Sequence, residues 1–159
     1  MRTKITWLVV VASWAASSTL GAGGAQAQRA KVKKTRAPAS GDYEVKFEQI
    51  ANNCTDTGMS LSKGTFTLSE KKGGKLEISF PMTAVMFGRI SDDGKFQAKA
   101  DLGGTGIQGV QGKFSIAGRV DDGLIQLVFI AEYYGSGKKP RPLCTQSWNA
   151  SGLRSDKMK

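Results

Sequence analysis

Apolar and polar residues alternate one by one along short segments from Asp42 onward, and glycine-containing turns separate these segments. The first segment places Tyr43, Val45 and Phe47 on one face and charged residues on the other. A two-residue period is typical of a β-strand with one buried face. Beyond the N-terminal region, no segment longer than about ten residues has the spacing of an amphipathic helix. The pattern therefore predicts an all-β domain.

Seven or eight such segments follow one another at short intervals. The Asp-Asp-Gly sequences at 92–94 and 121–123 are typical of tight hairpins, because glycine readily adopts positive φ. Later strands are expected to turn Leu76, Ile78 and Phe80, then Val85 and Phe87, and finally Ile125 to Tyr133 toward the core. This repetition predicts an antiparallel, barrel-like meander of seven or eight strands, with a two-layer β-sandwich as the alternative.

The chain has two cysteines, Cys54 and Cys144. We expect them to form a disulfide, since exported proteins fold in oxidising compartments. The closed loop would span about 90 residues, and such a crosslink stabilises a fold by roughly 4 to 5 kcal/mol in the chain-entropy model.

The N-terminus has the features of a cleavable secretory signal peptide covering residues 1–27. Arg2 and Lys4 precede an apolar stretch, which ends in the small-x-small motif Ala25-Gln26-Ala27. The apolar run is shorter than the roughly 20 residues that span a bilayer. We therefore predict an exported protein, periplasmic or extracellular, with no transmembrane segment after cleavage.

Basic residues are concentrated just after the predicted cleavage site. Residues 28–41 are predicted to form a disordered basic arm, residues 42–152 the β domain, and residues 153–159 a flexible tail. The arm's cations are Arg29, Lys31, Lys33, Lys34 and Arg36. They predict weak, salt-sensitive attraction to an anionic envelope surface. The arm lacks an aromatic side chain to stack on a base, so we expect no specific nucleic-acid binding.

The chain contains no histidine, which removes the most common general base and metal ligand. With both cysteines in a disulfide, carboxylates are the remaining candidates, and the Asp-Asp pairs are explained by their turns. Gly104, Gly106 and Gly109 match the dinucleotide-binding spacing, but strand-like sequence follows them where that motif needs a helix. We therefore expect no catalytic site, no metal site and no cofactor. An enzyme using carboxylates and Tyr133 or Tyr134 is a minor alternative.

The segment 124–134 has apolar residues on both faces. Its second face carries Val128, Ile130 and Tyr134 between polar neighbours. A central strand in a two-layer core explains this pattern, and an exposed apolar patch for a ligand or partner is the functional alternative.

The Asp93-Gly94-Lys95-Phe96 hairpin and the Cys144-x-x-x-Trp148 stretch resemble small exported bacterial β-meander proteins of no assigned activity. The resemblance covers residues 43–152 and carries no functional residue with it. Two functions remain open: a noncatalytic binding or interaction module of unknown ligand, and a calycin-like carrier with a cavity for a small apolar ligand. The carrier requires interior room, which would be lost if eight large rings all pointed inward: Phe47, Phe66, Phe80, Phe87, Phe96, Phe114, Phe129 and Trp148.

Overall fold

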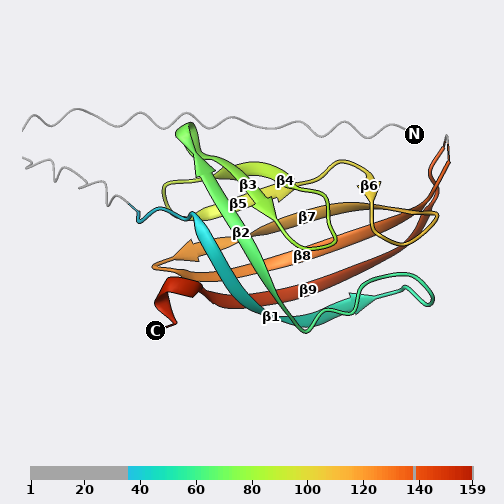
Figure 1. Cartoon of the computed structure of the whole chain (residues 1–159), viewed down its shortest axis with the longest axis horizontal. Helices are drawn as coiled ribbons and strands as arrows, with labels where there is room; N and C mark the ends of the chain where they lie inside the picture. Colours follow the sequence, from blue (N-terminus) through green and yellow to red (C-terminus); the bar gives the residue numbers. More distant parts are fainter. Residues whose placement is uncertain (1–35, 138, 159) are drawn as a thin grey trace, which may run out of the picture. The chain divides into compact units, whose positions relative to one another are not determined.

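The computed structural model describes residues 36–137 and 139–158, which form an antiparallel β-sheet of nine strands (Figure 1). The predicted signal peptide and most of the predicted arm lie outside the described residues. The strands are β1 (Gly41–Asn52), β2 (Lys63–Lys71), β3 (Lys75–Ser79), β4 (Met86–Ile90), β5 (Lys95–Lys99), β6 (Gly103–Gly104), β7 (Val110–Asp121), β8 (Leu124–Gly135) and β9 (Pro142–Arg154). Two short 3-10 turns, η1 (Lys72–Gly74) and η2 (Ser155–Lys157), complete the structure.

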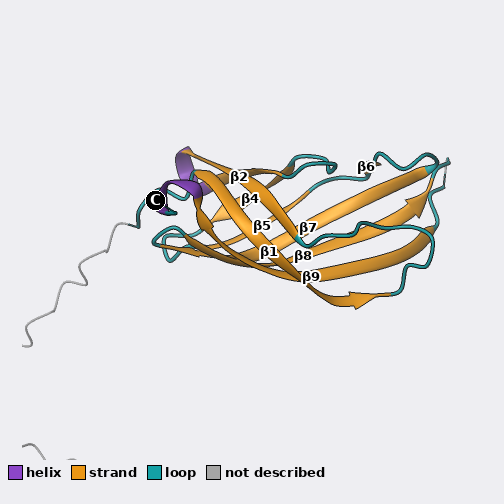
Figure 2. Cartoon of the chain, turned by 60° about the horizontal axis from the view of Figure 1, so that its bottom comes forward, coloured by secondary structure: helices purple, strands orange, loops and turns teal. Residues whose placement is uncertain are grey.

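The sheet closes on itself. Its order is β5-β4-β3-β2-β1-β9-β8-β7-β6, and β5 also pairs with β7. This pairing makes a ring of eight strands, with β6 attached to β7 outside the ring (Figure 2). The predicted barrel-like antiparallel meander is therefore confirmed. The β5–β7 pairing closes the ring, and β1 lies between β2 and β9, so that the first and last strands of the chain are neighbours.

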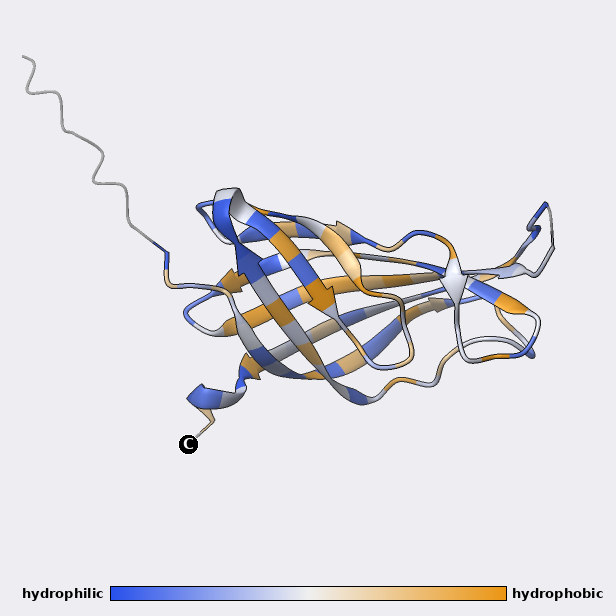
Figure 3. Cartoon of the chain, turned by 45° about the horizontal axis from the view of Figure 1, so that its top comes forward, coloured by the Kyte–Doolittle hydropathy of each residue, from blue (hydrophilic) through white to orange (hydrophobic). Residues whose placement is uncertain are grey.

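Aromatic side chains fill the ring. The alternation of apolar and polar residues along the strands is visible in Figure 3. The contacting rings have centroid separations of 4.5 to 6.5 Å. They belong to Phe47, Phe66, Phe80, Phe114, Phe129 and Trp148. Phe96 is also buried, as is the predicted inward face of β8 from Ile125 to Tyr133.

The predicted orientation of β4 is wrong. Val85 and Phe87 were expected to face the core, but Phe87 is 62% exposed. Met86 and Ile90 are buried in their place. Residues 85–90 have the sequence Val-Met-Phe-Gly-Arg-Ile, in which both the odd-numbered and the even-numbered positions include apolar residues. Alternation alone therefore does not determine which of the two sets faces inward.

Three glycines occupy inward-facing positions where the strands approach closely. A methyl group at Gly88 would lie 1.8 Å from the Gln97 carbonyl oxygen, and one at Gly118 would lie 2.2 Å from that of Gln126. The corresponding separation at Gly152 is 1.8 Å, from the Glu44 oxygen. Glycine within a strand permits close backbone approach and the bends that close a curved sheet.

The two ends of the ring differ. Short turns connect the strands at one end, and Asp122 and Gly123 both have positive φ there, at 45° and 81°. Longer connections lie at the other end: residues 53–62, 80–85, 100–109 and 136–141. This second end is called the loop end.

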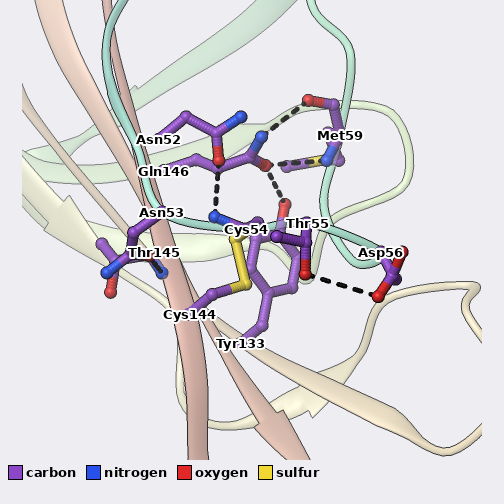
Figure 4. Close-up of a disulfide and its surroundings, with 10 residues drawn as sticks. All are labelled: Asn52, Asn53, Cys54, Thr55, Asp56, Met59, Tyr133, Cys144, Thr145 and Gln146. Atoms are coloured by element: carbon purple, nitrogen blue, oxygen red, sulfur yellow. Dashed lines mark hydrogen bonds between the residues drawn. A yellow bond between two sulfur atoms is a disulfide. The ribbon is translucent and has the colours of Figure 1, made fainter.

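The segment 53–62 is anchored at the loop end (Figure 4). Cys54 and Cys144 form the predicted disulfide, with an S–S distance of 2.02 Å. The buried Gln146 side chain accepts hydrogen bonds from Met59 N–H at 2.8 Å and Tyr133 O–H at 3.0 Å. Its amide nitrogen donates to the Met59 carbonyl oxygen at 3.3 Å. These contacts pin the loop to β8 and β9.

Residues 36–41, assigned from sequence to the disordered arm, pack on the β domain. Ala39 is fully buried, and its carbonyl oxygen accepts a 2.9 Å hydrogen bond from the Tyr43 hydroxyl. The Arg36 guanidinium lies 2.7 Å from Glu70 and is mostly buried. The prediction of disorder is wrong for these residues. It counted Arg36 as one of several neighbouring basic residues, whereas its ion-pair partner lies 34 residues away in the sequence.

The C-terminal boundary also differs from the prediction of a flexible tail from residue 153. β9 continues through Arg154, and η2 follows it. The Arg154 guanidinium pairs with Asp156 at 2.7 Å and donates to the Pro38 carbonyl oxygen at 3.1 Å. These contacts join the C-terminal segment to the N-terminal one.

The inward glycines lead to a prediction about stability. Gly118→Ala should lower the free energy of unfolding by about 1 to 3 kcal/mol, because the added methyl group overpacks the β7–β8 contact. Urea denaturation would measure the change. Gly135→Ala is the matched control, since nothing lies within 4 Å of the added methyl group. Equal stability of the two variants would contradict this role for Gly118.

Candidate functional site on the outer face of the ring

A shallow groove of about 380 Å³ crosses the outer face of β4, β5, β7 and β8. Side chains along it include Phe87, Arg89, Gln97, Lys99, Val128 and Ile130. The strand register produces this arrangement: Phe87 lies opposite Lys99, Lys99 opposite Ser115, and Ser115 opposite Ile130. Residues from four strands thus form one continuous surface, here called the outer groove.

The outer groove has exposed apolar side chains at its two sides. Phe87 is 62% exposed and Val128 is 37% exposed, while Ile130 is half-buried. Ala117 lies directly opposite Val128. Lys99 and Ser115 lie between Phe87 and Ile130 in the register, so the groove has apolar side chains at both sides and polar side chains between them. Exposed apolar side chains combined with polar ones in one groove are typical of a binding site.

The structure brings together two of the three residues of the predicted apolar patch. Val128 and Ile130 line the outer groove. Tyr134 lies farther along β8, opposite Gln111 and Pro142, about 13 Å from Ile130 at the usual rise of a strand. Sequence reasoning missed Phe87, which it assigned to the core, and also Arg89 and Lys99, which join the groove only through cross-strand register.

Unpaired cations lie at one side of the groove. Lys75 is directly opposite Arg89 on neighbouring strands, and Lys99 is opposite Phe87. Within residues 36–137 and 139–158, none of these three cations forms an ion pair. The nearby Glu77 is bonded to Lys71. Like charges directly opposite each other in a sheet are destabilising, so this register retains an unfavourable interaction at the surface.

The predicted arm contributes less here than its sequence suggests. Arg36 is paired with Glu70, and the other predicted polyanion-attracting residues lie outside the described part of the chain: Arg29, Lys31, Lys33 and Lys34. The structure instead places Lys75, Arg89 and Lys99 on three adjacent strands around the exposed Phe87.

The aspartates of the two turns have structural partners. Hydrogen bonds from Ser91 and Lys95 hold the pKa of Asp93 well below its usual range. Asp122 lies 3.3 Å from Lys157. The described residues contain no group of three or more side chains that could hold a metal ion. The glycines at 104–109 lead into strand β7, so the helix that a dinucleotide motif requires does not follow them.

Tyr133 is buried beneath the anchored loop and donates its hydroxyl hydrogen to Gln146. Burial raises the pKa of Tyr133 to about 12, since the phenolate would lose its hydration. The hydroxyl therefore stays protonated well into the alkaline range and donates the hydrogen bond that holds Gln146 beneath the loop.

No family model, curated protein or solved structure matches this chain. None of the helical segments in the described part of the chain could span a bilayer.

The opposed cations lead to a prediction about stability and salt. Lys75→Gln should raise the free energy of unfolding by a few tenths of a kcal/mol at low ionic strength, because it removes the repulsion from Arg89. Lys113→Gln is the control with the opposite expected sign, since Lys113 lies 3.8 Å from Glu132. Thermal or urea melts at low and high salt would measure both effects. A destabilised Lys75→Gln protein at low salt would show that the pair is not repulsive.

Proposed function

We propose that this protein is an exported, noncatalytic binding module and that the outer groove is its ligand surface. The observation that carries the proposal is the combination, in one groove, of exposed apolar side chains with cations that lack ion-pair partners among the described residues. Phe87 and Val128 supply apolar contact, while Arg89 and Lys99 supply positive charge. Such a surface suits a ligand that has both an apolar part and a negative charge.

Export is supported by two independent features. The N-terminal sequence predicts a secretory signal, and the disulfide joins β9 to the loop after β1. Disulfides persist chiefly in oxidising compartments.

The packed interior favours a surface binder over a calycin-like carrier. Seven of the eight large aromatic rings point into the interior of the ring of strands, and Phe87 is the exception. The Phe66 and Phe80 rings are 4.5 Å apart, and Phe129 lies 5.6 Å from Trp148. A carrier of this size would need interior space that these rings occupy.

Titration with anilinonaphthalene sulfonate, a fluorescent anionic aromatic probe, tests the proposal. We expect one molecule to bind per protein, and Val128→Asp to weaken that binding at least tenfold by adding a negative charge to the outer groove. Thr65→Asp is the matched control, because Thr65 is exposed on the outer face of β2 and does not line the outer groove. Melting temperatures would verify that both variants fold.

The proposal would be rejected if Val128→Asp bound the probe as tightly as the parent protein. Binding that survived this change but was lost with a substitution at the interior Phe129 would support the carrier alternative.

A further inference from the structure

Two loops at the loop end carry exposed apolar side chains close to the outer groove. Met82 is 66% exposed, and Val85, Leu102 and Ile107 are each 37 to 38% exposed. The two loops are neighbours, since a methyl group at Gly103 would lie 3.7 Å from the Ala84 Cβ atom. The apolar rim is defined as Met82, Val85, Phe87, Leu102 and Ile107.

Met82 is presented in a backbone conformation that disfavours its own residue type. It has φ of 64° and follows Pro81 in a turn closed by the Thr83 N–H, which donates to the Phe80 carbonyl oxygen at 3.3 Å. The Thr83 hydroxyl donates to the same oxygen at 2.9 Å. Glycine is favoured where a turn requires positive φ after proline. The chain therefore maintains a long, exposed apolar side chain where glycine would be less strained.

One cation lies beside the apolar rim, and two more follow on the same outer face toward the end with short turns. Lys99 is opposite Phe87, Arg89 lies two residues farther along the same face of β4, and Lys75 is opposite Arg89. Two acidic residues also lie near residues of the apolar rim. Glu77, opposite Phe87, is bonded to Lys71, and Asp101 is exposed beside Leu102.

We propose that the apolar rim inserts into the surface of an anionic phospholipid bilayer while Lys75, Arg89 and Lys99 contact its headgroups. Apolar side chains that project from adjacent loops can enter the boundary between headgroups and acyl chains, and flanking cations add attraction to anionic lipid. A bilayer suits this surface better than an acidic peptide, because the apolar groups project from loops over a wide area and do not enclose a pocket. This inference rests on the proposed function, since it names a partner for the same face.

Fluorescence of a Phe87→Trp variant tests the depth of insertion. Trp148 is the one other tryptophan outside the predicted signal peptide, and it is fully buried. With vesicles of phosphatidylcholine and phosphatidylglycerol, we expect a blue shift and quenching by brominated acyl chains. Ser151→Trp is the matched control and should show neither change, because β9 lies opposite β4 in the ring.

Vesicle sedimentation measures the contribution of each group. Met82→Gly should weaken partitioning about fivefold to tenfold through the loss of buried apolar surface, while its melting temperature stays equal to that of the parent or rises. Lys75→Gln and Lys99→Gln should each weaken partitioning about fivefold at low salt. A variant with Arg29, Lys31, Lys33 and Lys34 changed to Gln separates the arm from the rim, and it should retain the Phe87→Trp quenching.

The bilayer proposal would be overturned if Phe87→Trp showed no quenching, if the arm variant abolished it, or if an acidic peptide bound this face in place of vesicles. Binding of the fluorescent sulfonate without vesicle binding would reject the bilayer and leave the proposed function standing. Loss of both would reject both.

Discussion

The packing of aromatic rings inside a closed sheet determines most of this structure. Eight strands surround one cluster centred on Phe129, which contacts Phe66, Phe114 and Trp148. The strands can approach and bend around that cluster because inward positions such as Gly118 and Gly152 carry no side chain. The close packing of the interior therefore requires glycine at these positions.

A filled interior leaves the outside of the ring and its loops as the surfaces available for binding. Two residue placements on those surfaces are locally unfavourable: Lys75 lies opposite the like-charged Arg89, and Met82, which is not a glycine, has a positive φ. Phe87 is exposed on a strand whose alternate residues are buried. Departures from local preference that cluster in one region are typical of functional sites, because stability alone would favour other residues there.

Alternation and turn chemistry were sufficient to predict the class of fold, the hairpins at Gly94 and Gly123, and the inward face of β8. The pairing of Cys54 with Cys144 followed from the cysteine count and the expected compartment. The sequence did not predict the orientation of β4, where apolar residues occur at both odd and even positions. It also did not predict the packing of Arg36, whose partner Glu70 is remote in sequence. The outer groove was only half predicted, because Val128 and Ile130 share a strand whereas Phe87 and Arg89 join them through cross-strand register.

Crystals of the protein under xenon pressure would test most directly whether the ring is filled. Xenon occupies apolar cavities in protein interiors. A packed aromatic core predicts no ordered xenon among Phe47, Phe66 and Phe129, whatever binds on the outer face. Ordered xenon at the centre of the ring would contradict this view of the core and would restore an interior ligand site.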